Sequence, residues 1–348
     1  MIKTEKPQEL YISSARVNAS INKPKIAIIR VLEACNAGCF MCAFAFSKDN
    51  YRFERDKLKE IISNGNGALK VIRLTGGEPL LLDNISDLLH DIKEAGISSS
   101  IISNGWYLSE KTRKNELKHL DQIIISIDGP TAEKHNKFRR LPGLFEKLLA
   151  GIRAIKFHQP RTLIRVNTVV GHHNFHLLRE IYDMLGAEGI NQWSLIPLKR
   201  SEGTWGRMTV EEIIKTMSAF NQWVHDHPNN VKILGYGLKL YGRTDEEIRD
   251  NWLKSRNMAP QKQCQLVDLV RYYVPKEDTI FPCNCVPHRS GSINFSEGLT
   301  PESFNGSDLA EARSWLRNNG PKQCKGCEPI NAALGDGVID LETDIFGF

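Results

Sequence analysis

The chain has 348 residues, of which 41% are hydrophobic and 25% are charged, close to the average for soluble globular proteins. Its formal net charge of +5 comes from 46 basic and 41 acidic residues, without the dense basic block that would indicate nucleic-acid binding. No apolar run approaches the roughly 18 residues of a membrane span, and the charged start lacks the apolar segment of a signal peptide. These features exclude disordered, collagen-like and integral membrane proteins. They predict a cytoplasmic protein that binds neither nucleic acid nor a membrane.

Short strand-like runs alternate with amphipathic helix patterns between residues 25 and 225. The runs are rich in Ile, Val and Leu, which is typical of strands buried on both faces. The predicted strands span residues 25–32, 70–74, 98–102, 122–127, 162–170 and 192–198. Helix patterns fill the gaps, and Gly96 and Gly186 stand where helices are expected to end. Strands that alternate with helices predict right-handed βαβ units around a parallel sheet.

The expected fold class is therefore α/β. Six such units are too few for a closed eight-fold barrel, so we expect an open, partial (β/α)6 barrel of the TIM type over residues 25–225, with its chemistry at the carboxyl ends of the strands. Residues 1–24 form an N-terminal extension, and the mixed, charged residues 226–262 are interpreted as a connection. Residues 263–348 contain five of the eight cysteines, which predicts a small domain held together by metal, followed by a tail.

Three cysteines follow the first predicted strand with the spacing C-x3-C-x2-C: Cys35, Cys39 and Cys42. In a chain without a secretory signal, clustered cysteines are more often metal ligands than disulfides. A strand points its side chains to alternate faces, so a loop after the strand is better able to aim three thiolates at one site. Three soft thiolates suit an iron–sulfur cluster or zinc, although structural zinc usually takes four protein ligands.

Glycines and polar residues stand near the ends of the later predicted strands. The second strand runs into Gly76-Gly77-Glu78-Pro79. The two glycines predict a close approach of the backbone to a ligand, and the carboxylate suits a nearby cation. Strands three to six end close to Asn104, Ser126, Asn167 and Leu198, respectively.

With these motifs in this order, the sequence resembles the radical S-adenosylmethionine (SAM) superfamily, whose hallmark is the C-x3-C-x2-C loop. The resemblance implies that Cys35, Cys39 and Cys42 hold a 4Fe–4S cluster whose open iron binds SAM. It further implies that the segment from Gly76 to Pro79 binds the methionyl amine. Met41 occupies the position before the third cysteine, which is usually aromatic in the family. The ribose, carboxylate and adenine of SAM are expected at Asn104, Ser126, Asn167 and Leu198.

The resemblance also implies a reaction. An electron donor of the flavodoxin or ferredoxin type reduces the cluster, and SAM is cleaved to methionine and a 5′-deoxyadenosyl radical. The radical then abstracts hydrogen from an unactivated C–H bond, while the protein orients the cosubstrate and excludes water.

The second group of cysteines is Cys264, Cys283, Cys285, Cys324 and Cys327, of which the last two form a C-x2-C pair. Spacing alone leaves a structural zinc site open. The layout resembles the twitch, or shortened SPASM, domain of the same superfamily. This implies one auxiliary 4Fe–4S cluster on Cys264, Cys283, Cys324 and Cys327. Cys283 and Cys285 are separated by a single residue, and we expect only one of the two, Cys283, to be a ligand.

Peptide-modifying members of the superfamily often carry a domain that recognises a leader peptide. The 24 residues before the first predicted strand are too few for such a domain, which favours a small-molecule substrate over a peptide. Local sequence around residues 33–44, 165–174, 192–199 and 287–289 resembles the cytosylglucuronate decarboxylase group of nucleoside-antibiotic biosynthesis. In that group, hydrogen abstraction from the sugar is followed by loss of the carboxylate as carbon dioxide. Such an acid needs a nearby cation, and the candidates are Lys199, Arg73, Arg139 and Arg200.

Three alternatives remain. The first is a sugar or aminocyclitol dehydrogenase or epimerase of the same superfamily. The second is a radical SAM peptide maturase. The third is a non-enzymatic zinc-binding protein.

Overall fold

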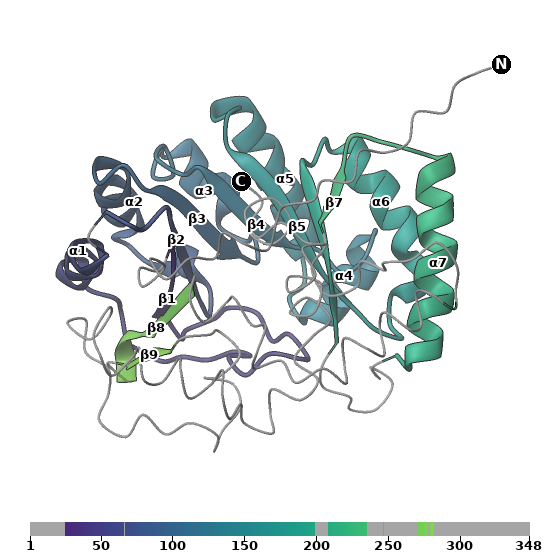
Figure 1. The fold of residues 1–348 in the computed structure, drawn as a ribbon, viewed down its shortest axis with the longest axis horizontal. Helices are drawn as coiled ribbons and strands as arrows, with labels where there is room; N and C mark the ends of the chain where they lie inside the picture. The colour runs from purple at the N-terminus through teal and green to yellow at the C-terminus, as the bar shows by residue number, and fades with distance from the viewer. Residues whose placement is uncertain are drawn as a thin grey trace, which may run out of the picture.

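The computed structural model describes residues 25–65, 67–198, 208–234, 246, 270–277 and 279–281. Within these residues, one nine-stranded sheet has the order β7-β6-β5-β4-β3-β2-β1-β8-β9 (Figure 1). The strands are β1 (Ile26–Leu32), β2 (Val71–Gly76), β3 (Ser98–Ser103), β4 (Gln122–Ser126), β5 (Leu163–Val170), β6 (Gln192–Pro197), β7 (Lys232–Leu234), β8 (Val270–Val274) and β9 (Thr279–Phe281). The α-helices are α1 (Arg55–Asn64), α2 (Ile85–Glu94), α3 (Leu108–Arg113), α4 (Ala132–Arg139), α5 (Leu144–His158), α6 (Leu178–Ala187) and α7 (Val210–Asp226). Short 3-10 helices are η2 (Pro79–Leu81), η3 (Phe175–Leu177) and η5 (Pro275–Glu277).

The sheet is parallel from β7 to β8, and β9 pairs with β8 in the antiparallel direction. The six predicted strands are confirmed as β1 to β6, and the α/β partial-barrel fold is confirmed with them. The sheet is wider than expected, because β7 comes from the expected connection and β8 and β9 come from the expected cysteine-rich domain. Ile26 in β1 lies opposite Val270 in β8. No local pattern predicts a pairing between segments so far apart in the chain.

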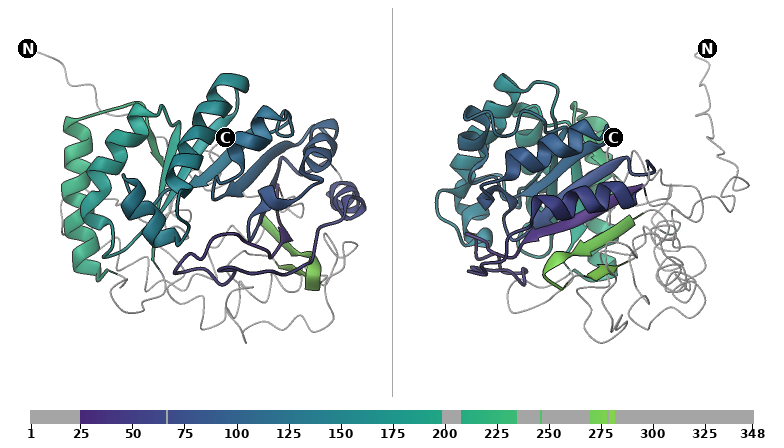
Figure 2. Two further views of the ribbon diagram at one scale, coloured as in Figure 1. Left: turned by 180° about the vertical axis from the view of Figure 1, so that it is seen from behind. Right: turned by 90° about the vertical axis from the view of Figure 1, so that its left-hand side faces the viewer.

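The two faces of the sheet carry different side chains. Residues such as Ile29 and Leu74 are buried in the core, and the helices lie along one side of the strands (Figure 2). On the opposite face, Arg73 donates from Nε to Ser100 Oγ at 3.2 Å and from Nη2 to Gln122 Oε1 at 3.3 Å. Ser100 also donates to Gln122, at 2.9 Å. These strands are buried on both faces, as expected, and alternate residues on β2, β3 and β4 form a buried polar row.

The helix patterns are confirmed in detail for α2, whose buried residues recur at helical spacing: Ile85, Leu88, Leu89 and Ile92. Gly96 follows α2 with a φ of +69°, as expected for a residue that ends a helix. The expectation for Gly186 is wrong, because Gly186 lies inside α6. Gly189, with a φ of +62°, takes the left-handed conformation after that helix. Of the helices in the described ranges, none is long and apolar enough to cross a lipid bilayer.

Candidate active site

The loop that follows β1 carries the first three cysteines and folds back on itself. Two backbone hydrogen bonds close it, from the N–H of Cys35 to the carbonyl of Ser47 and from the N–H of Phe46 to the carbonyl of Ala37, both at 2.9 Å. Cys39 is buried, whereas Cys35 is half-buried and Cys42 is exposed. The cysteines therefore sit in an ordered loop at the carboxyl edge of the parallel sheet, the expected place for chemistry in this fold class.

Each of the three sulfurs accepts a hydrogen bond from an N–H group. The donors are the backbone of Ala37 to Cys35 at 3.5 Å and the backbone of Phe44 to Cys42 at 3.4 Å. Arg139 Nη1 donates to Cys39 Sγ at 3.6 Å. Hydrogen bonds of this kind stabilise thiolates and tune iron–sulfur clusters, so the donor set fits such a cluster.

Burial opposes the charged form of two of these thiols when no metal is bound. It raises the pKa of Cys35 to about 12, although the Ala37 N–H acts in the opposite direction. Burial also raises the pKa of Cys39, and the charge of Arg139 lowers it. Metal binding must therefore displace protons from the loop.

Two further observations test the fit of a cluster. Across the described ranges, no three His, Cys, Asp or Glu side chains gather closely enough to hold a single metal ion. The ligands of a four-iron cluster can lie farther apart than those of a single metal ion, because each thiolate binds a different iron. The buried Asn36 Nδ2, next to Cys35, has no hydrogen-bond partner among the described residues. A buried donor without a partner is costly, so this atom suits an acceptor on a bound group.

The two glycines after β2 allow the backbone to pass directly against the start of the cysteine loop. A Cβ on Gly76 would lie 2.1 Å from the carbonyl oxygen of Leu32, and a Cβ on Gly77 would lie 2.0 Å from that of Ala34. The N–H groups of Gly77 and Glu78 donate to these two carbonyls at 3.0 and 2.8 Å. The glycines thus let the backbone approach the protein's own loop, and their expected role at the cosubstrate stays a prediction.

Glu78 is completely buried and links the ends of β2 and β3. Its Oε1 accepts from the N–H of Leu80 at 3.0 Å and from Ser103 Oγ at 2.7 Å. Its Oε2 accepts from the N–H of Asn104 at 2.7 Å. Burial raises the pKa of Glu78 to about 7, against the opposing effect of these hydrogen bonds. The carboxylate therefore holds the turn after β3, and its expected role beside a bound amine stays a prediction.

Asn104 connects that turn to the cysteine loop. Its Nδ2 donates to Asn36 Oδ1 at 2.8 Å, and its Oδ1 accepts from the N–H of Trp106 at 2.9 Å. Glu78, Asn104 and Asn36 thus form a continuous chain of hydrogen bonds from β2 through β3 to the residue after Cys35. Among the residues expected at the cosubstrate, Asn104 contacts the cysteine loop through its side chain and Glu78 through its backbone N–H.

An ion pair that the sequence interpretation missed lies beside Cys39. Asp128, just after β4, accepts from Arg139 Nε at 2.5 Å and from the N–H of Val169 at 2.7 Å. The N–H of Asp128 donates to His135 Nδ1 at 3.2 Å. Arg139 had been one of several candidate cations for a substrate carboxylate. An acidic residue after a strand was visible in the sequence, but its partner eleven residues later was not.

A second set of charges anchors the far end of the cysteine loop. Glu33 accepts from Arg30 Nη1 at 3.1 Å and from Lys276 Nζ at 3.0 Å. Lys276 also donates to Asp49, at 2.5 Å. Because Lys276 belongs to η5, these contacts join the loop to the segment that follows β8.

Some of the remaining predicted residues lie within the described ranges and others lie outside them. Ser126 at the end of β4 lies opposite Asn167 in β5, which accepts from Arg165 at 3.2 Å. Leu198 is buried, and its N–H donates to the carbonyl of Val170 at 2.8 Å. Met41 is half-buried in the cysteine loop, Pro79 is the first residue of η2, and Arg73 lies within β2 on the polar face. The other predicted residues lie outside the described ranges: Lys199, Arg200, Cys264, Cys283, Cys324 and Cys327.

Three histidines, at residues 172, 173 and 176, lie around the start of η3. His172 Nε2 lies 3.0 Å from Glu212 Oε2, and the ring of His173 stacks on Phe138 with centroids 3.9 Å apart.

Comparisons with known proteins give a family match, sequence relatives and similar folds. Residues 29–185 match the family model of the Radical SAM superfamily. An AdoMet-dependent heme synthase from Methanosarcina barkeri (strain Fusaro) is 28% identical over 191 residues, which cover 53% of this chain and 54% of that protein. A probable GTP 3′,8-cyclase from Saccharolobus solfataricus is 26% identical over 175 residues, which cover 49% and 56%. The chain spans about half the length of the curated relatives it matches.

The solved structures show the fold. SuiB from Streptococcus suis, bound to S-adenosylmethionine, has a TM-score of 0.62 at 14% identity, with 89% of this chain and 72% of that chain covered. Native anSMEcpe with bound AdoMet has a TM-score of 0.56 at 16% identity, with 86% and 90% covered. The resemblances to a SPASM or twitch domain and to cytosylglucuronate decarboxylases stay predictions.

Proposed function

We propose that the protein is a radical SAM enzyme that cleaves SAM reductively, because residues 29–185 match the family model of that superfamily. A 4Fe–4S cluster with one open iron, together with SAM, supplies the electron transfer and the hydrogen-abstracting radical when both are bound. The observation that carries the proposal is the loop of Cys35, Cys39 and Cys42, in which every sulfur accepts an N–H. Three thiolates leave one iron of a four-iron cluster without a protein ligand.

The residues around the loop would orient the bound groups. Gly77 and Asn104 fix the loop against the ends of β2 and β3. The buried Arg139 places a positive charge beside Cys39 and is itself neutralised in part by Asp128. A buried cation offsets some of the negative charge that three thiolates bring to a cluster. Fixed groups of this kind also exclude water from the reacting atoms.

The face of the sheet opposite the helices, here called the inner face, is polar, and this favours a polar substrate. Arg73, Ser100 and Gln122 form a hydrogen-bonded row on that face, and Arg165 donates to Asn167 on β5. Polar side chains in such positions give orientation and specificity to polar ligands. We therefore propose that a small sugar or nucleoside is the substrate. The first candidate is a cytosylglucuronate-like acid that loses its carboxylate as carbon dioxide, with Arg73 and Lys199 as the cations that bind the acid.

An auxiliary 4Fe–4S cluster on Cys264, Cys283, Cys324 and Cys327 is part of the same proposal. The support is the cysteine spacing, with Cys285 as the alternative to Cys283. Anaerobic reconstitution should then give about eight irons and eight sulfides per chain, the content of two four-iron clusters. A content of about four irons and four sulfides would support the cluster on Cys35, Cys39 and Cys42 and refute the auxiliary cluster.

A peptide maturase is the second candidate function. Its support is the likeness in fold to SuiB, which has been solved with its precursor peptide SuiA. The polar inner face does not distinguish a peptide from a sugar acid, because both present hydrogen-bonding groups.

The decisive experiment is turnover of the anaerobically reconstituted protein with SAM and dithionite. We expect a brown protein that releases 5′-deoxyadenosine, and none of this product when dithionite is omitted. Colourless protein that contains zinc without iron or sulfide would refute the proposal and favour the non-enzymatic zinc-binding alternative.

The substrate is then tested by mass spectrometry with cytosylglucuronate deuterated on the sugar. Loss of carbon dioxide, with deuterium in 5′-deoxyadenosine, would support a decarboxylase. Oxidation or epimerisation without loss of carbon dioxide would indicate a dehydrogenase or an epimerase. If sugar acids remain unchanged while a peptide is modified, the second candidate replaces the first.

A further inference from the structure

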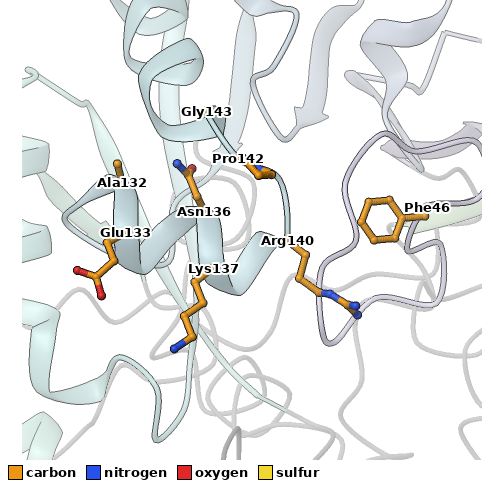
Figure 3. A pocket seen from close by; sticks show the side chains of 8 residues that line it. All are labelled: Phe46, Ala132, Glu133, Asn136, Lys137, Arg140, Pro142 and Gly143. Carbon is orange, nitrogen blue, oxygen red and sulfur yellow. The ribbon is translucent and has the colours of Figure 1, made fainter.

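An open cavity of about 500 Å³ lies at the protein surface, along α4 and the turn that leads to α5 (Figure 3). Its lining includes Phe46 from the cysteine loop, Lys137 and Arg140 from α4 and its end, and Gly143 before α5. None of the lining residues belongs to a strand. The cavity is therefore separate from the polar inner face of the sheet on which the proposed substrate is expected.

Phe46 presents an aromatic ring at one side of this cavity. The side chain is 49% exposed, an unusual state among the large hydrophobic residues that the structure describes. The loop holds it there: its N–H donates to the carbonyl of Ala37 at 2.9 Å, and a Cβ on Gly38 would meet the ring at 1.9 Å. Phe46 also has a left-handed φ of +52°, which a non-glycine residue adopts only when its surroundings enforce it. The ring thus lies directly against the residue before Cys39.

Arg140 forms the facing side of the cavity. Its guanidinium lies 5.8 Å from the centre of the Phe46 ring, and Figure 3 shows the two side chains approaching each other from different segments. The preceding residue, Arg139, donates to Cys39 Sγ. Both sides of the cavity therefore lie close to Cys39. The Phe46 ring packs against Gly38, which precedes Cys39, and Arg140 follows Arg139, which contacts the Cys39 sulfur.

The charge around the cavity is positive on balance. Lys137 and Arg140 line it together with a single carboxylate, Glu133, and Lys134 adds an exposed cation on the same helix. An exposed aromatic ring within a rim of cations is typical of a protein-docking surface that fits an acidic partner.

We propose that this cavity is the docking site for an acidic one-electron carrier protein, of the flavodoxin or ferredoxin class, that reduces the cluster. The inference rests on the proposed function, because reductive cleavage needs one external electron for each SAM. The carrier loses one electron and is oxidised, the cluster gains that electron and is reduced, and no bond forms or breaks at the surface. Docking beside Phe46 brings the carrier to the outer side of Cys39 and leaves the inner face free for substrate.

The test compares two reductants on one pair of variants. In the double variant Lys137→Glu, Arg140→Glu, the rim changes sign without any change to a cysteine or to a residue of the inner face. The control is Lys118→Glu, an exposed lysine that precedes the amino end of β4, whereas the cysteine loop lies at the carboxyl ends of the strands. SAM cleavage is measured with dithionite and, separately, with increasing concentrations of a reduced flavodoxin. Flavodoxin binding to each reconstituted variant is measured directly.

We expect the dithionite-driven rate to stay at the parent value in both variants. With flavodoxin, the apparent kcat/KM for the carrier should fall at least about tenfold in the double variant, because charge reversal removes electrostatic steering. The same change should weaken flavodoxin binding and flatten the salt dependence of the rate. Lys118→Glu should leave all three measurements unchanged.

Other outcomes overturn the inference. An unchanged flavodoxin-driven rate would mean that the carrier docks elsewhere. Equal losses with dithionite and flavodoxin would mean that the substitutions damage the cluster, and a raised KM for the substrate alone would make the cavity a substrate-binding surface. If the parent protein itself fails to cleave SAM with dithionite, the proposed function fails first, and that result is distinct from each of these.

Discussion

Replacing Gly77 with alanine should disturb the cysteine loop through backbone contact alone. The new Cβ would lie 2.0 Å from the carbonyl oxygen of Ala34 and 2.7 Å from that of Glu33. Ordinary contact begins at 3.4 Å, so the two backbone segments must separate by about 1.4 Å. That separation would also break the 2.8 Å hydrogen bond from Glu78 to Ala34. Overpacking costs roughly 1–3 kcal/mol and the lost hydrogen bond about 1 kcal/mol, so we expect a loss of about 2–4 kcal/mol.

Two measurements check this expectation. The unfolding of the cluster-free protein by urea should shift to lower denaturant concentration, and reconstituted Gly77→Ala should bind less iron, because Ala34 immediately precedes Cys35. Gly67→Ala is the control: Gly67 has a φ of +70° but nothing within 4 Å of an added Cβ. This control should lose only roughly 1–2 kcal/mol through backbone strain and keep its iron. If Gly77→Ala unfolds like the parent and holds the same iron, the close approach of β2 does not position the loop.

Two further predictions concern the surroundings of the loop. Cys39→Ala should lose the SAM-binding cluster and its characteristic absorption, since two thiolates rarely retain four irons; a variant that cleaves SAM at the parent rate would remove Cys39 from the ligand set. His135 is completely buried, and burial lowers its pKa to about 3. Below pH 6.5 this histidine is therefore protonated in the unfolded chain but stays neutral in the folded protein. The free energy of unfolding should therefore fall by about 2–3 kcal/mol between pH 6.5 and 4.5 from this residue, and His135→Gln should flatten the dependence in urea titrations of cluster-free protein. Parallel pH profiles for the two proteins would contradict this assignment.

Local sequence patterns predicted the six strands β1 to β6, because a buried parallel strand and an amphipathic helix each leave a clear signature in a few neighbouring residues. The same locality explains the errors. Local patterns do not show that Arg73, Ser100 and Gln122 form one polar row, because the three residues come from three different strands. The pattern misplaces the end of α6 at Gly186, because a glycine inside a helix and one just beyond it look alike in the sequence.

By itself, the sequence determined the identity and order of the groups that make the chemistry possible. Three cysteines in one short loop, followed by two glycines and a glutamate after the next strand, are local features, so their chemistry can be read without a fold. Only the tertiary structure decided what those groups touch. It placed Arg139 beside Cys39, turned Glu78 toward Asn104, brought β8 alongside β1 and left Phe46 exposed next to Arg140. Each of these features depends on residues from separate elements. Their side chains meet only when the strands and helices have packed around the sheet, which no local pattern in the sequence specifies.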